Sequence, residues 1–181
     1  MNKKILTVAM FSCMSVASAS AIADNTNKTY FGAQYAIGTY SEDGFDDVNP
    51  TALVGRFGKY FNDNFALEGR LGIGIQDDSI NIFGTDVTLE IDTILGIYGI
   101  GHFNLNETSS VYGLLGLTRA EATVSASGFG SDSDDETGLS FGVGADIGVS
   151  ETVALNIEYT QYLNKSDFDF SALSFGAVFS F

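Results

Sequence analysis

Six ionisable side chains occupy alternating positions within apolar segments of the sequence, so their types and spacing could support chemistry. They are Arg56, Glu68, Arg70, Glu90, Asp92 and Glu158. Alternating residues of an extended strand point to the same face, and buried charges persist only when they are paired. Two interpretations fit this set, a structural network of ion pairs and a gated path for protons or ions. If the strands close into a barrel of about eight, side chains fill its interior and leave no open path. This favours the structural network.

The remaining candidate groups give little support for catalysis or metal binding. His102 is the only histidine of the chain, so we expect no enzyme activity, no cofactor and no metal site. An acidic run in the second half of the chain offers oxygen ligands of the kind that calcium prefers. A solvated acidic loop that contacts a surface or ligand is the favoured interpretation. Its candidate contact residues are Asp132, Asp134, Asp135 and Glu136.

The segments that must position these groups alternate apolar residues with small or polar ones. Eight such segments span about 29–40, 51–61, 65–75, 87–103, 110–124, 139–149, 152–162 and 171–181. A period of two predicts strands with one apolar face. The connections at 62–64, 104–109 and 150–151 are short and alternate with longer, mostly acidic ones. Membrane barrels with an even number of strands have this arrangement, with the short turns in the periplasm.

Two all-β architectures could use these strands, a water-soluble sandwich and a membrane barrel. The polar faces are rich in glycine and carry few charges of mixed sign, which suits a narrow interior packed with small side chains. Lipid offers no hydrogen-bond partners, so strands can cross it only in a closed sheet. We predict an all-β fold, an eight-stranded antiparallel transmembrane β-barrel, over residues 24–181.

The first 23 residues have the order of a secretory signal peptide. Lys3 and Lys4 precede an apolar run that gives way to small residues ending at Ala23, and the run is shorter than the roughly 20 residues that span a bilayer as a helix. Cleavage after Ala23 would remove the only cysteine, Cys13, and take the formal net charge from −15 to −17. Such an acidic chain argues against nucleic acid as a partner, because phosphate binding needs a basic patch.

The fifth segment, 110–124, allows two registers. Its apolar residues share a parity with two charged residues: Val111, Leu115, Leu117, Arg119 and Glu121. Either the two charges face lipid near one end of the strand, or the apolar trio faces the interior. We favour the second register.

Several stretches resemble one family of small bacterial barrels. These are GRFGKYFNDNFALEGRLGIG (55–74), VYGLLGL (111–117), ALNIEYTQY (154–162) and LSFGAVFSF (173–181). They are similar to the outer-membrane barrels labelled porin-family or opacity-type, a superfamily that includes the OmpA-like membrane barrel and the OmpX and Ail group. The resemblance covers the predicted mature chain and rests on residues that build barrels.

The resemblance implies a location, partners and a function. The protein is expected in the cell outer membrane, in contact with lipid and lipopolysaccharide, after assembly by the outer-membrane insertion machinery. That machinery reads a C-terminal strand ending in phenylalanine, and the residues that match are Phe175, Phe179 and Phe181. The expected function is envelope integrity or contact with a host or surface ligand through acidic extracellular loops, and the alternative is a narrow channel for small solutes or ions.

Overall fold

The computed structural model describes residues 25–42, 48–82, 85–126, 130–164 and 168–181. The predicted signal peptide lies outside these residues. The described chain forms β1 (Thr29–Glu42), β2 (Thr51–Tyr60), β3 (Phe65–Gln76), β4 (Asp78–Ile82), β5 (Thr85–Asn104), β6 (Ser110–Ala126), β7 (Gly130–Gly148), β8 (Val153–Asn164) and β9 (Phe168–Ser180). Within these ranges no helix has the length and apolar character needed to span a membrane.

The strands form a closed antiparallel barrel of eight. The sheet order is β3-β2-β1-β9-β8-β7-β6-β5-β4, and an additional pairing of β3 with β5 closes the circle. The first and last strands pair from Tyr30↔Ser180 to Glu42↔Phe168. Strand β4 is not part of this circle. It pairs with β5 above the closed part of the barrel. The prediction of an eight-stranded antiparallel barrel is confirmed.

Alternation along the strands separates an apolar exterior from a mixed interior. The alternating burial is clear in β2 and β3, where outward residues such as Phe57 and Leu71 are 58% and 56% exposed. The interior holds aromatic and aliphatic side chains, among them Tyr30, Val54, Tyr98, Ile100, Tyr112 and Tyr162. Glycines leave room for the inward tyrosines: a Cβ atom on Gly58 would overlap the Tyr30 ring.

A β-bulge in β5 changes which residues face the interior. The register with β6 shifts between Ile91 and Thr93, and a bulge inserts one residue that has no partner. Above this point the parity is reversed, so Ile91 is buried whereas Leu95 is 49% exposed. Unbroken alternation over the predicted segment 87–103 would place Ile91 and Leu95 on one face, and in this respect the prediction for that segment was wrong.

The register favoured for the fifth segment was also wrong. Val111, Leu115 and Leu117 are 41%, 57% and 53% exposed and face outward from β6. The charges on the same face are tolerated because β6 has 17 residues, more than the roughly 9–11 that cross a bilayer. Arg119 and Glu121 lie toward the far end of the strand, beyond the apolar belt.

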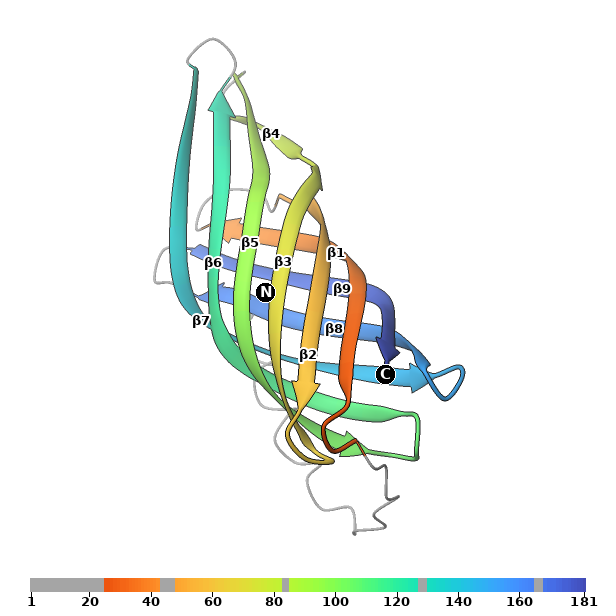
Figure 1. Ribbon diagram of the computed structural model, residues 1–181. Helices are drawn as coiled ribbons and strands as arrows, with labels where there is room; N and C mark the ends of the chain where they lie inside the picture. The colour runs from red at the N-terminus through yellow and green to blue at the C-terminus, as the bar shows by residue number, and fades with distance from the viewer. Residues whose placement is uncertain (1–24, 43–47, 83–84, 127–129, 165–167) are drawn as a thin grey trace, which may run out of the picture.

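Strands β5 to β7 continue past the closed part of the barrel, and β4 pairs with β5 there, all within the same sheet. The upper parts of β5, β6 and β7 extend beyond the other strands in Figure 1, and β4 lies at their side. We call this the protruding sheet; it comprises 78–82, 85–92, 119–126 and 130–138. Two of the expected acidic loops are thus largely strands. The pairing of Ser131–Thr137 with Arg119–Ser125 shows that the acidic run is part of β7.

The two ends of the barrel differ. The described ends of the chain lie at the end with short turns, where Asn25 donates its backbone N–H to the Asp63 carboxylate at 3.1 Å and Thr29 pairs with Phe181. The protruding sheet lies at the opposite end. Since short turns of membrane barrels are typically periplasmic, we expect the protruding sheet on the extracellular side.

Candidate functional site

Four of the six predicted charges meet inside the barrel. Arg56 from β2, Glu68 and Arg70 from β3 and Glu158 from β8 have fully buried side chains. Arg56 Nη2 lies 2.7 Å from Glu68 Oε2, and Arg70 Nε lies 2.6 Å from Glu68 Oε1. Arg70 also binds both Glu158 oxygens, at 2.5 and 2.8 Å. Two positive and two negative groups thus form a neutral network that crosses the interior.

The topology explains why this network needs a strand from the opposite wall. Arg56 and Arg70 are direct cross-strand partners, and like charges in that position repel each other. Glu68, two residues before Arg70, neutralises part of this charge from the same hairpin. Glu158 supplies the rest from β8, which is not a neighbour of β2 or β3 in the sheet.

Tyrosines complete the coordination of the buried carboxylates. Tyr30 donates its hydroxyl to Glu68 at 2.7 Å, and Tyr112 donates to Glu158 at the same distance. The Arg70 guanidinium lies 4.7 Å from the centre of the Tyr98 ring, within the range of a cation–π contact. Charge-assisted and bidentate hydrogen bonds are stronger than those between neutral groups. The network therefore stabilises the contact between the two opposite walls of the barrel.

Sequence reasoning did not find the tyrosine partners. Tyr30 and Tyr112 have the same inward parity as the charged residues, and this parity is the signal that could have found them. Tyr112 could not be found because the register favoured for β6 placed its side chain on the outer face. His102 also faces the interior, where its ring nitrogens lie 3.0 Å from Ser110 Oγ and 3.3 Å from the Tyr60 hydroxyl.

Two residues of the predicted set lie outside the network. Glu90 is exposed, and Asp92 is half-buried and accepts a hydrogen bond from Thr123 at 2.7 Å. Both belong to the part of β5 above the barrel, where the bulge at Asp92 has reversed the parity. Their grouping with the interior charges is corrected accordingly.

The predicted contact residues are brought together on β7 of the protruding sheet. Asp132, Asp134 and Asp135 are exposed, and Glu136 is partly exposed. Arg119 on β6 pairs with Asp135 at 3.1 Å, with side chains 59% and 48% exposed. In the described part of the chain no group of three or more His, Cys, Asp or Glu side chains could hold a metal ion.

The C-terminal phenylalanines face outward. Phe175, Phe179 and Phe181 are 44%, 41% and 67% exposed, and the Phe179 ring stacks on Phe31 of β1 with centroids 5.1 Å apart. These contacts lie along the β1–β9 seam that closes the barrel.

A closed sheet with an apolar exterior, an interior that holds buried ion pairs and short turns at one end defines an outer-membrane barrel protein. A model of the family described as outer membrane protein beta-barrel domain matches residues 6–181. The chain belongs to this family and is located in the outer membrane.

The chain has a sequence relative along its whole length. The chain is 27% identical over 187 residues to the attachment invasion locus protein of Yersinia pseudotuberculosis serotype I (strain IP32953), covering 100% of this chain and 98% of that protein.

Two solved structures share the fold. The crystal structure of Ail, the attachment invasion locus protein of Yersinia pestis, matches with a TM-score of 0.64 at 21% identity, over 86% of this chain and 99% of that one. Ail has also been solved in complex with the heparin analogue sucrose octasulfate. Neisserial surface protein A matches with a TM-score of 0.66 at 18% identity, over 84% and 97% of the two chains.

Proposed function

We propose that this protein is a non-enzymatic surface-contact protein that contributes to adhesion or envelope integrity through its protruding sheet. The observation that carries this proposal is the exposed acidic strand β7, which extends beyond the membrane-spanning part of the barrel. The similarity to attachment invasion locus proteins supports a role in contact with a host or another surface.

The edge of the protruding sheet provides a mode of contact. β7 pairs with β6 from Gly130 to Asp146, but its described pairing with β8 begins only at Phe141. Between Gly130 and Ser140 the described strands cover one edge of β7 and leave the other without a ladder. Such an edge can accept an extended segment of another chain through backbone hydrogen bonds.

The charge of this strand selects the partner. Asp132 and Asp134 project from it with no basic residue between Ser131 and Glu136, so an extended partner segment rich in lysine or arginine is electrostatically matched. A heparin analogue is polyanionic, and the Ail complex with such a ligand therefore gives no direct template for this surface. We expect a cationic ligand.

The alternative function, a narrow channel, receives less support from the interior. The network of Arg56, Glu68, Arg70 and Glu158 reaches from β2 and β3 to β8 with fully buried side chains. Eight-stranded barrels have interiors just wide enough to be filled by side chains. We infer that the network is a structural plug.

The membrane partners follow from the exterior of the barrel. Outward residues such as Leu71 and Leu115 are proposed to contact lipid, and the extracellular rim is proposed to contact lipopolysaccharide. We propose that the insertion machinery reads β9 through Phe175, Phe179 and Phe181, whose exposure on the closing strand supports that role.

Neutralising the acidic strand tests the proposed function. We expect the variant Asp132→Asn, Asp134→Asn, Asp135→Asn to bind a lysine-rich peptide and host cells at least about fivefold more weakly, because the complementary charge is lost. Binding would be measured with intact cells that display equal amounts of protein. The variant Glu107→Gln, Glu151→Gln removes two carboxylates from the turns at the opposite end of the barrel and is expected to bind like the parent. Undiminished binding by the first variant would exclude the acidic strand as the contact surface.

A further inference from the structure

A small cavity lies at the periplasmic mouth of the barrel. Its volume is about 60 Å³, several times the roughly 10–15 Å³ that a single water molecule needs. Three parts of the chain line it: the segment before β1, the turn between β5 and β6, and the turn between β7 and β8. The lower wall of the barrel supplies Tyr60 and Asp146.

Asp146 is the unusual group in this cavity. It is 9% exposed, yet among the described residues it forms no ion pair, in contrast to the four charges higher in the barrel. One oxygen, Oδ1, accepts a hydrogen bond from Asn156 Nδ2 at 2.6 Å. A carboxylate taken out of water is costly unless it is paired. Asp146 therefore lacks a positive partner within the part of the chain that the structure describes.

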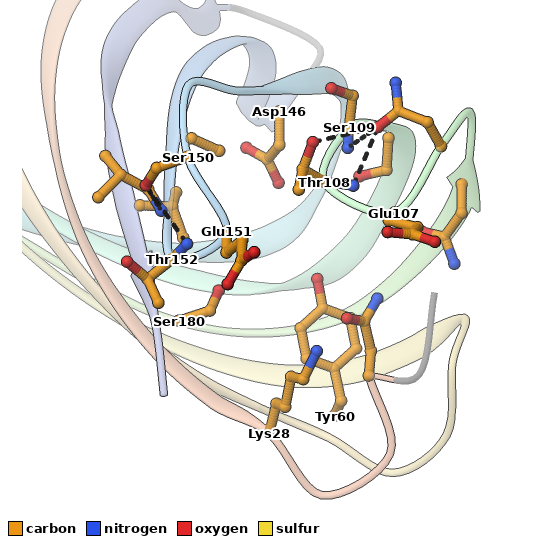
Figure 2. A pocket seen from close by; sticks show the side chains of 17 residues that line it. Lys28, Tyr60, Glu107, Thr108, Ser109, Asp146, Ser150, Glu151, Thr152 and Ser180 are labelled. Carbon is orange, nitrogen blue, oxygen red and sulfur yellow. Dashed lines mark hydrogen bonds between the residues drawn. The ribbon is translucent and has the colours of Figure 1, made fainter. Parts of the chain in front are cut away.

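The surroundings of Asp146 add acceptors and further negative charge. Figure 2 shows Asp146, Glu151 and Lys28 among the side chains that line the pocket. Glu107 also lines the pocket, so three acidic residues and one lysine surround it. Lys28 is exposed and lies apart from Asp146. Hydroxyl-bearing residues of the turns and of the start of β6 also line it: Thr108, Ser109, Ser110, Ser150 and Thr152.

We propose that this cavity binds a primary ammonium group, with Asp146 as its counter-ion. An ammonium group carries three hydrogen-bond donors and no acceptor, which matches a space rich in carboxylates and hydroxyls. The cavity has room for the ammonium nitrogen and one or two attached carbons. A calcium ion would need six to eight close oxygen ligands, and the described residues contain no group of carboxylates close enough to hold a metal.

A chain of hydrogen bonds also connects Asp146 to the buried ion-pair network. Asn156 bonds both Asp146 and the Tyr112 hydroxyl, at 2.6 and 2.8 Å, and Tyr112 donates to Glu158 of the plug. A cation bound at Asp146 is thus linked to the buried network through two hydrogen-bonded side chains. The ammonium group could belong to a free small amine or to a lysine side chain of a periplasmic protein, since both present the same chemistry.

Amine titrations of the folded protein test the proposal. The ¹⁵N-labelled protein in detergent micelles would be titrated with ethylammonium chloride and followed by NMR, at constant ionic strength. We expect saturable shifts of the amide signals from 104–110 and 146–152. In Asp146→Asn the affinity is expected to fall at least about tenfold, because the charge-assisted hydrogen bond is lost. The matched control Glu121→Gln removes an exposed carboxylate from β6 at the opposite end of the barrel and should bind like the parent.

Three results would overturn the proposal: no saturable shifts in the parent, equal affinity in Asp146→Asn, or equal shifts with tetramethylammonium, which has no N–H donor. If Asp146→Asn does not fold, Glu151→Gln serves instead. It is expected to weaken binding about threefold through the loss of one nearby charge, and unchanged affinity would count against the site. A capped lysine amide that binds more tightly than ethylammonium would assign the source to a protein side chain, and weaker binding would assign it to a free amine.

Discussion

Replacing Arg70 by methionine is expected to lower the free energy of unfolding by about 3–5 kcal/mol, the usual cost of breaking a buried ion pair. Arg70 binds Glu158 through two nitrogens and Glu68 through a third. Its removal leaves two buried carboxylates that share the single cation Arg56. Urea unfolding in lipid vesicles, followed by circular dichroism, would measure the change.

Two control variants separate the buried network from a general effect of charge. The double variant Arg70→Met, Glu158→Met restores neutrality and retains the Arg56–Glu68 pair, so it should recover much of the lost stability. Arg119→Met removes an exposed pair with Asp135, and such pairs contribute about 0–1 kcal/mol. Equal losses for Arg70→Met and Arg119→Met would contradict the assignment of a stabilising plug.

The second large effect concerns the lipid-facing surface. Ile97 is 54% exposed on β5, between Gly69 and Leu117 on the adjacent strands. In Ile97→Arg a charge would stand among apolar side chains that face lipid, at a cost of about 2–4 kcal/mol near the bilayer midplane. Refolding yields into vesicles and urea titrations would both report this loss.

A matched substitution on the protruding sheet should have little effect. Val124 is 45% exposed on β6 and pairs across the strand with Asp132. Because this part of β6 lies beyond the membrane-spanning region, Val124→Arg should change the free energy of unfolding by less than about 0.5 kcal/mol. A similar loss for the two arginine variants would mean that the boundary of the membrane has been placed incorrectly.

The spanning strands were predictable because period-two alternation survives wherever one face meets lipid. The predicted segments 29–40, 51–61 and 65–75 closely match β1, β2 and β3. The bulge at Asp92 was not predictable, because an added residue reverses the parity without changing the composition of the strand. The prediction for β6 failed for another reason: Arg119 and Glu121 share the lipid-facing parity but stand outside the bilayer.

The strands of the protruding sheet could not be predicted from the amino-acid composition of this part of the chain. Asp, Ser and Gly are poor strand formers, so the stretch from Ser125 to Gly138 resembles a loop in the sequence. The strand over 130–138 comes from pairing with β6, which is a tertiary effect. In the interior, Arg56, Glu68, Arg70 and Glu158 could be grouped from parity and the cost of burying charge. Their tyrosine partners needed the true register and the three-dimensional arrangement.

Labelling of single cysteines in intact cells tests most directly whether the acidic sheet is displayed outside the cell. The predicted mature chain has no cysteine, so Ser133→Cys on β7 and Glu107→Cys in the turn between β5 and β6 can be compared with the parent chain. We expect a membrane-impermeant maleimide to label Ser133→Cys in intact cells and Glu107→Cys only after the outer membrane is permeabilised. Labelling of Glu107→Cys but not of Ser133→Cys in intact cells would contradict this orientation, and with it the proposed contact surface.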